Sequence, residues 1–308
     1  MEFLHESVML DQSIEALSIN PAGIYVDGTA GGGGHSLAIA QRLTSGRLIS
    51  IDKDAAAVAA ATKRLESFGH ATVVKSDYAD VDKVLDNLGI EYVDGILLDL
   101  GVSSFQLDNE DRGFSYHADA PLDMRMDTAQ GITAAELLKD IGEAELAAIL
   151  FKYADEKYAR RIARAIVNAR QNTLVDTTAK LSEIIKEAVP AAYRRQRHPA
   201  RRTFQAIRIV VNAEMDHLQT GLNKAFERLN KNGRLVIITF HSLEDRIVKR
   251  YFAALSQTCV CPKSSPICTC GGVAKGELVY RKALAPTSEE IENNPRSRSA
   301  KLRAIKKL

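Results

Sequence analysis

The sequence predicts an α/β protein with a doubly wound, mainly parallel sheet, an antiparallel sheet edge and an inserted all-helical domain. Three observations support this fold class. Within roughly the first 100 residues, short apolar runs alternate with helix-forming segments, as in parallel sheets covered on both faces. Roughly 130 residues then separate the strand ending at Asp99 from the next clear strand, far more than one crossover needs. Two closing strands, expected at 278–284 and 300–306, would pair antiparallel at the edge.

Residues 24–35 contain the first strand and a glycine-rich turn. The strand ends in Asp27, and five glycines occupy the seven positions from 28 to 34 before a helix-like pattern starts. Glycine has no Cβ and adopts positive φ, so a turn of this kind brings bare backbone close to a ligand. A glycine-rich surface turn without a ligand is the alternative.

The spacing of these glycines narrows the choice of ligand. A dinucleotide fingerprint would need glycine or alanine at Ser36 or Leu37, and a P-loop would need a lysine followed by serine or threonine, so both are excluded. Gly31 and Gly33 lie four and six positions after Asp27, which is typical of the nucleoside-binding turn of S-adenosylmethionine enzymes. The pattern therefore predicts this cofactor.

Two further strands place acids at the same edge of the sheet. The second strand, residues 47–52, ends in Asp52 about 20 residues after the glycines, where a carboxylate can accept both ribose hydroxyls. The elements that follow are strands at 71–75 and 92–99 and helices at 54–68 and 81–88. Asp99 ends the fourth strand, where it can hydrogen-bond the cofactor's amine or an amino group awaiting methylation. An acid that only caps the next turn is the alternative.

The long interval after Asp99 is predicted to be helical. Thr133 and Glu136 form a capping box at the start of its first helix. Helices are expected at 134–139, 143–153, 156–170, 178–189 and 199–229, followed by a turn at Asn232-Gly233, a strand at 234–240 and a helix at 241–255. We therefore expect a methyltransferase domain at 1–108 and 210–308, with an inserted helical substrate-recognition domain at 109–209.

The composition is that of an ordinary globular protein. The 308 residues are 45% hydrophobic and 26% charged, with 41 lysines and arginines against 39 acids, so net charge indicates no class of partner. No apolar run approaches the ~18 residues of a membrane span, and the first 20 residues carry acids instead of a basic and then apolar signal. We expect a cytoplasmic protein with no membrane association.

Seven blocks of the chain resemble, in order, those of the bacterial 16S rRNA cytosine-N4 methyltransferase family, also called RsmH or MraW. They are residues 27–36, 95–104, 112–115, 121–126, 198–206, 240–246 and 294–299. The resemblance implies a class I S-adenosylmethionine-dependent methyltransferase whose substrate is a cytidine in the decoding centre of 16S rRNA. It also implies that Asp52 holds the cofactor's ribose and that the other cofactor contacts are Gly33, Gly34, His35, Tyr78, Asp99 and Gln106.

This reaction gives Asp99 a catalytic role. The cytosine amine is a poor nucleophile because its lone pair is delocalised into the ring. An acceptor that pulls on an N4 hydrogen localises the pair, and Asp99 or the carbonyl of Leu100 is placed to do so. Amino-methylating enzymes usually carry an aromatic residue directly after this acid. None follows directly here, so Phe105 and Tyr116 are the candidates for stacking on the base.

Local charge predicts an RNA-binding face. Residues 193–208 carry six arginines and no acid, and arginine pairs with phosphates and stacks on exposed bases. The residues assigned to RNA are Arg194, Arg195, Arg197, His198, Arg201 and Arg202, together with His241 after the fifth strand. A solvated helix face is the alternative for the tract. A second basic stretch, residues 296–307, fits RNA contact and sheet-edge solubility equally well.

The four cysteines lie within twelve positions: Cys259, Cys261, Cys268 and Cys270. Such a cluster could close a tetrahedral structural zinc site, and reduced thiols are the alternative. The overall prediction is an RNA methyltransferase acting on 16S rRNA, with the small ribosomal subunit as its partner. A methyltransferase for another substrate and a non-catalytic RNA-binding or assembly factor are the rivals. The sequence leaves open whether the chain forms a homodimer.

Overall fold

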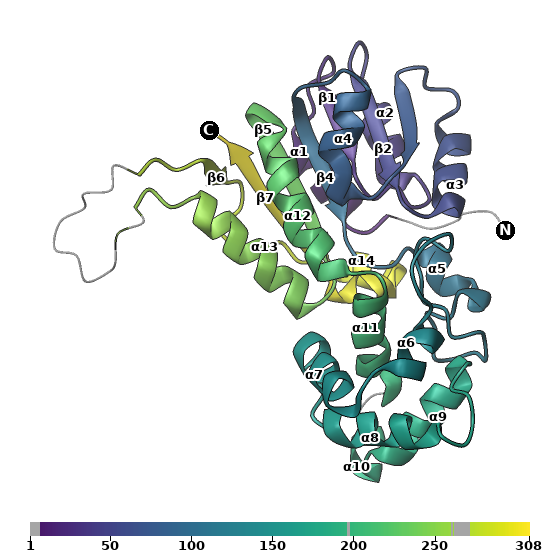
Figure 1. Ribbon diagram of the computed structural model, residues 1–308. Coiled ribbons are helices and arrows are strands. Elements are labelled where there is room, and N and C mark those ends of the chain that lie inside the picture. The colour runs from purple at the N-terminus through teal and green to yellow at the C-terminus, as the bar shows by residue number, and fades with distance from the viewer. Residues whose placement is uncertain (1–6, 196–197, 260, 262–271) are drawn as a thin grey trace. The chain divides into compact units, whose positions relative to one another are not determined.

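A computed structural model describes residues 7–195, 198–259, 261 and 272–308. In this part of the chain seven strands form one sheet in the order β3-β2-β1-β4-β5-β7-β6 (Figure 1). The strands are β1 (Ile24–Asp27), β2 (Arg47–Asp52), β3 (Ala71–Lys75), β4 (Val93–Asp99), β5 (Leu229–Thr239), β6 (Gly276–Leu278) and β7 (Lys301–Lys307). Strands β1 to β5 pair in parallel, whereas β7 runs antiparallel to both β5 and β6. This topology confirms the predicted doubly wound sheet with an antiparallel edge.

The chain divides into two compact units. The first combines Met1–Gly101 with Asp216–Leu308, and the second is Val102–Met215. The helices of the first unit are α1 (Leu10–Leu17), α2 (Gly34–Ala40), α3 (Ala55–Leu65), α4 (Val81–Asn87), α12 (Glu214–Glu227, from Asp216 onward), α13 (Ser242–Leu255) and α14 (Ser288–Asn293), with 3₁₀ turns η1 (Tyr78–Asp80) and η3 (Pro295–Ser299). None of the described helices has the length and apolar character needed to span a membrane.

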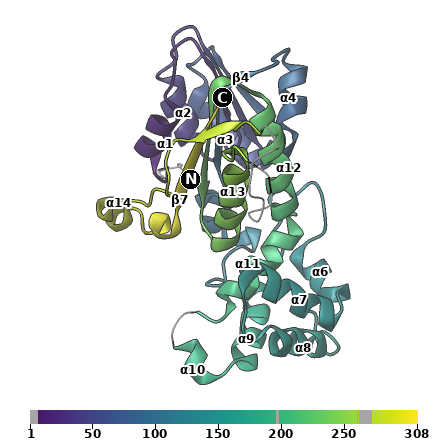
Figure 2. The same ribbon diagram turned by 90° about the vertical axis from the view of Figure 1, so that its left-hand side faces the viewer.

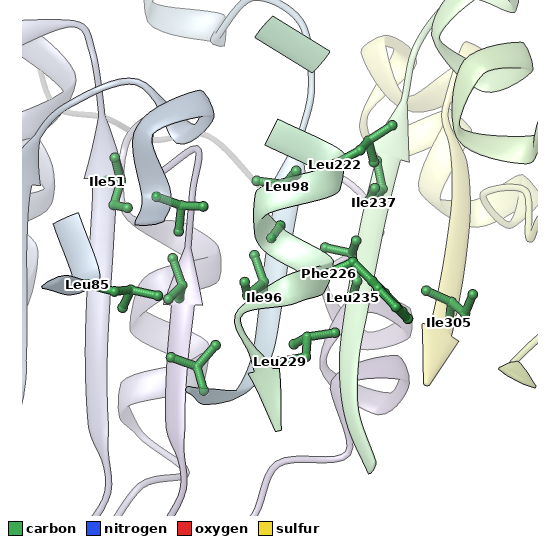
Figure 3. Packing of buried hydrophobic residues seen from close by; sticks show 14 of the residues in the cluster. Ile51, Leu85, Ile96, Leu98, Leu222, Phe226, Leu229, Leu235, Ile237 and Ile305 are labelled. Atoms are coloured by element: carbon green, nitrogen blue, oxygen red, sulfur yellow. The ribbon is translucent and has the colours of Figure 1, made fainter. Parts of the chain in front are cut away.

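Helices cover both faces of the sheet, because alternate residues of each strand point to opposite sides. Ile96 and Leu98 of β4 belong to a core shared with α4, α12 and α13, which Figure 3 shows from close by. Leu97, between them, belongs to the other core, which contains residues of α1, α2 and α3. Figure 2 shows α1 and α2 on one side of the sheet and α12 on the other. Burial on both faces explains why the strands are almost wholly apolar.

The second unit is all-helical and has a core of its own. It contains α5 (Ser104–Asp108), η2 (Glu110–Arg112), α6 (Ala134–Asp140), α7 (Glu143–Ala154), α8 (Ala159–Ala169), α9 (Thr178–Ala188), α10 (Ala191–Arg194) and α11 (Ala200–Val211). The predicted capping box starts α6: Glu136 N donates to Thr133 Oγ1 at 3.1 Å, and Thr133 N donates to Glu136 Oε2 at 2.7 Å. Leu150, Ile166 and Phe204 are among the side chains that α7, α8 and α11 bury together.

Three predicted boundaries were wrong. The expected helix at 199–229 is two helices, because the Asn212 side chain bonds to Met124 O and Met126 N and Ala213 adopts a positive φ of 48°. The predicted turn at Asn232-Gly233 is an irregularity inside β5, which starts at Leu229. The strand expected at 278–284 pairs only over Gly276–Leu278 and through one bridge at Leu284, so the edge strand is short.

Candidate functional site

The turn between β1 and α2 is organised by a buried carboxylate. Asp27 is fully buried; its Oδ2 accepts a hydrogen bond from Ser36 Oγ at 2.6 Å and its Oδ1 accepts one from Thr29 N at 3.2 Å. Burial raises the pKa of Asp27 to about 6, against the lowering effect of these hydrogen bonds. Because no part of Asp27 reaches solvent, its role is to shape the turn.

The glycines of this turn are required by the backbone and by its neighbours. Gly31 and Gly33 have φ values of 51° and 78°, which side-chain-bearing residues rarely adopt. A Cβ at Gly33 would lie 3.2 Å from Ala61 Cα of α3, and a Cβ at Gly34 would overlap Ser7 Oγ. The turn can therefore present backbone groups at the carboxyl end of β1 only while these positions are glycine.

Asp52, at the end of β2, faces the same turn. Its Oδ2 accepts a hydrogen bond from Gly31 N at 2.8 Å, and its Oδ1 accepts one from Asp54 N at 2.9 Å. Burial raises the pKa of Asp52 to about 6, although these two hydrogen bonds lower it and the charges of Asp54 and Asp27 add to the rise. A carboxylate offers about four acceptor positions, so Asp52 keeps acceptor capacity for ligand hydroxyls.

Asp99 ends β4 and lies beside Thr29 and His35. Its backbone N–H donates to Thr29 Oγ1 at 2.6 Å, and its Oδ2 lies 3.8 Å from His35 Nδ1. Its Oδ1 is buried without a hydrogen-bond partner among the described residues. Burial raises the pKa of Asp99 well above its ordinary value, and the charges of Asp27 and Glu244 raise it further.

His35 is neutral beside this acid. Its Nε2 lies 3.1 Å from Val8 O, and because a carbonyl only accepts, Nε2 carries the ring proton. Burial lowers the pKa of His35 to about 4 despite this hydrogen bond. His35 therefore presents the unprotonated Nδ1 towards Asp99.

These groups fit the nucleoside cofactor expected from the sequence. Positive-φ glycines, an acid with acceptor capacity and a buried carboxylate oxygen that no described residue donates to lie at the carboxyl ends of β1, β2 and β4. Ligands of open α/β sheets bind outside this edge. Buried polar atoms are normally hydrogen-bonded, so we expect a ligand to donate to Asp99 Oδ1, to which no described residue donates. A nucleoside that carries hydroxyls and an amine has several such donors. Thr29, which holds the Asp99 backbone, is the site residue that the sequence pattern did not single out.

The other expected cofactor residues lie in two places. Tyr78 belongs to η1, shortly after β3 in the first unit. Its side chain packs against the core to which α12 contributes. Gln106 belongs to the second unit, where its side chain accepts a hydrogen bond from Ser103 N at 3.0 Å and closes the capping box of α5. Contact of either residue with the cofactor stays a prediction.

The basic tract of the second unit is largely exposed. Arg194, Arg195 and Arg201 are exposed, whereas Arg202 donates to Asp155 O at 2.9 Å. His198 is exposed and stacks on Tyr116, with ring centroids 4.4 Å apart and planes inclined by 15°. Arg208, at the end of the tract, forms an ion pair with Glu214. Arg197 lies outside the described residues.

His241 and the second basic stretch carry structural contacts. His241 is the N-cap of α13, where its Nδ1 accepts from Glu244 N and Glu244 accepts from His241 N. Lys301 and Arg303 of β7 pair with Asp245 at 3.1 and 2.7 Å. His241 and Glu244 therefore cap α13, and part of the basic stretch forms ion pairs within the first unit. RNA contact by His241 stays a prediction.

Half of the cysteine cluster can be described. Cys259 is exposed, and Cys261 N lies 3.4 Å from Cys259 Sγ. Cys268 and Cys270 lie outside the described residues, so the zinc site stays a prediction.

The sheet order, the glycine turn and the acids at three strand ends define a class I S-adenosylmethionine-dependent methyltransferase. The model of the MraW methylase family matches residues 2–308. The chain belongs to this family.

Two sequence relatives agree with this assignment. The chain is 51% identical to "Ribosomal RNA small subunit methyltransferase H" of Lachnospira eligens over 311 residues, covering 100% of this chain and 99% of that one. The protein of the same name from Brevibacillus brevis is 50% identical over 311 residues, with the same coverage. A solved rRNA methylase from Streptococcus thermophilus matches with a TM-score of 0.44 and 12% identity, covering 97% of this chain and 93% of that one.

Proposed function

We propose that this protein transfers the methyl group of S-adenosylmethionine to N4 of a cytidine in the decoding centre of 16S rRNA. Membership of the MraW methylase family and about 50% identity to small-subunit rRNA methyltransferases support the reaction and the class of substrate. Of the residues in the chain, Asp99 carries the proposal, because its Oδ1 is a buried acceptor without a hydrogen-bond partner among the described residues.

The chemistry requires little beyond positioning and one acceptor. The bound cofactor supplies a methyl group that its sulfonium already activates, so in-line displacement depends mainly on holding the amine in place. In our proposal Asp99 Oδ1 accepts an N4 hydrogen and localises the nitrogen lone pair. That hydrogen bond favours the ionised carboxyl, so it opposes the burial that raises the pKa of Asp99.

His35 and Thr29 support Asp99 in this proposal. Thr29 fixes the backbone of Asp99, and the neutral His35 places no competing positive charge beside the carboxyl group. Asp52 holds the cofactor ribose, and the left-handed glycines let the turn approach the nucleoside. The roles of Gly33, Gly34, Tyr78 and Gln106 at the cofactor belong to the same proposal.

The second unit supplies the RNA contacts in this proposal. The exposed Arg194, Arg195 and Arg201 offer guanidinium groups to phosphates, and the stacked rings of Tyr116 and His198 offer an aromatic face to an unpaired base. The partner is 16S rRNA, within the small ribosomal subunit.

Transfer of labelled methyl groups tests the proposal. Purified protein would be incubated with methyl-labelled cofactor and either naked 16S rRNA or small subunits from cells lacking the protein. We expect the label in N4-methylated cytidine after digestion to nucleosides, at a rate that Asp99→Asn lowers by about 100-fold or more. Label in another nucleoside, or none with either substrate, would contradict the proposal. Preference for the subunit over naked RNA would support the ribosomal partner.

A further inference from the structure

One face of α12 is directed at the turn that follows β3. His217, Gly221 and Lys224 are spaced by four and three residues, so they share one face of the helix. His217 Nδ1 lies 2.9 Å from Asp77 Oδ2. Lys224 Nζ lies 2.9 Å from Asp82 Oδ1, at the start of α4. The helix thus contacts polar side chains at both ends of the segment that contains Tyr78.

Between these two contacts, the backbone of α12 at Gly221 lies against the Tyr78 ring. A Cβ at Gly221 would lie 2.6 Å from Cδ2 and 2.7 Å from Cε2 of Tyr78, closer than real Cβ atoms come. A Cβ at Gly28 would lie 3.2 Å from Tyr78 Cβ. Two glycines, one just after β1 and one in α12, therefore lie close to Tyr78.

Asp77 fixes the backbone of the same turn. Its Oδ1 accepts a hydrogen bond from Ala79 N at 2.9 Å, and its Oδ2 lies 3.3 Å from Lys53 Nζ. Burial favours a higher pKa for Asp77, but the contact with His217 and the charge of Lys53 outweigh it and hold the pKa at about 2. Lys53 directly follows Asp52, so Asp77 ties the turn to the end of β2 and to α12 at once.

We propose that Gly221 and His217 are positioning residues for the cofactor. Gly221 lets the Tyr78 ring lie against α12, and His217 holds Asp77, so together they set the ring and the turn in the place where the nucleoside binds. The inference rests on the proposed function, because it requires Tyr78 to contact the cofactor. The proposal thus gives α12 a role in cofactor binding, although none of the expected cofactor contacts lies in this helix.

Substitution of Gly221 tests the proposal directly. Alanine normally stabilises a helix relative to glycine. Gly221→Ala should therefore leave cofactor binding unchanged if the position of the Tyr78 ring has no part in it. We expect its Kd for S-adenosylhomocysteine, measured by calorimetry, to rise at least tenfold. Thr220→Ala, at an exposed position of the same helix, is the matched control and should stay within twofold of the unchanged protein.

A double-mutant cycle separates the ring contact from general damage. In a Tyr78→Ala background the added methyl group has room, so Gly221→Ala should raise the thermal midpoint there while lowering it in the unchanged protein. Equal effects of Gly221→Ala in both backgrounds would overturn the proposed contact. The midpoint is measurable even where Tyr78→Ala abolishes cofactor binding.

His217 supplies an independent readout. We expect His217→Gln to raise the KM for S-adenosylmethionine at least fivefold with kcat within twofold, because it displaces a binding element and leaves Asp99 in place. Gln219→Ala, at an exposed position of the same helix, is the control and should leave both KM and kcat within twofold. If the unchanged protein binds S-adenosylhomocysteine and both Gly221→Ala and His217→Gln bind it equally well, the inference fails and the proposed function stands. If the unchanged protein does not bind it, the proposed function fails as well.

Discussion

Cofactor affinity should depend on pH through Asp52. Burial raises the pKa of this carboxyl to about 6 in the free protein, so it holds a proton over a wider pH range than an exposed aspartate. Ribose hydroxyls donate to the ionised form, so binding must release that proton when it is present. At pH 5 only about one-tenth of the molecules would have Asp52 ionised, so the Kd should be about tenfold higher than at pH 7.

Calorimetry with S-adenosylhomocysteine between pH 5 and 8 measures this effect. We expect affinity to rise with pH up to about 6 and then to level off. Proton release on binding should be seen at pH 5 in buffers of different ionisation enthalpy. Asp52→Asn cannot titrate and should bind weakly with no such slope. Affinity that is constant from pH 5 to 8, or a slope that persists in Asp52→Asn, would refute the reasoning. Circular dichroism at pH 5 checks that the fold is intact.

Three further predictions follow from the site. Gly33→Ala should lower the unfolding free energy by about 1–3 kcal/mol and weaken cofactor binding at least tenfold. The reason is that Gly33 has a φ of 78° and that its Cβ would lie 3.2 Å from Ala61 Cα. Chemical denaturation measures the loss of stability, with Gly69→Ala as the control because a Cβ at Gly69 meets nothing within 4 Å. Asp99→Asn should lower kcat by about 100-fold or more with a nearly unchanged Kd for S-adenosylhomocysteine; the reverse pattern would make Asp99 a binding residue. Arg201→Gln should reduce the slope of log affinity for RNA against log salt by about 1, whereas exposed Arg160→Gln in α8 should leave it unchanged; equal slopes would count against the basic tract as the RNA face.

Much of the site could be predicted because its signals are local in sequence. The acids Asp27, Asp52 and Asp99 each end a strand, and the glycine turn follows the first of these strands. Parallel strands bring their carboxyl ends to one edge of the sheet. The capping box at Thr133 was equally local. The sequence pattern did not separate the role of Asp27, which is buried inside the turn, from the role of Asp52, which keeps acceptor capacity for a ligand.

The features that escaped prediction depend on contacts between distant residues. The break between α11 and α12 comes from Asn212, whose side chain bonds to backbone more than 80 positions earlier. Gly221 is only a helix-weakening residue in the sequence of an amphipathic helix, and its use becomes visible when the Tyr78 ring is placed against it. The hydrophobic periodicity of a helix predicts which face is buried, but it does not predict which residue packs against that face.

The place of β7 in the sheet has a consequence for how the protein is made on the ribosome. Strands β1 to β4 can pair soon after residue 99 is synthesised, yet β5 is translated only after the whole second unit, and its far edge is covered by β7, residues 301–307. A nascent chain therefore carries first an open β4 edge and then an open β5 edge until residues 301–307 have been translated. We expect chains that stall before residue 300 to be prone to pairing with other exposed strands.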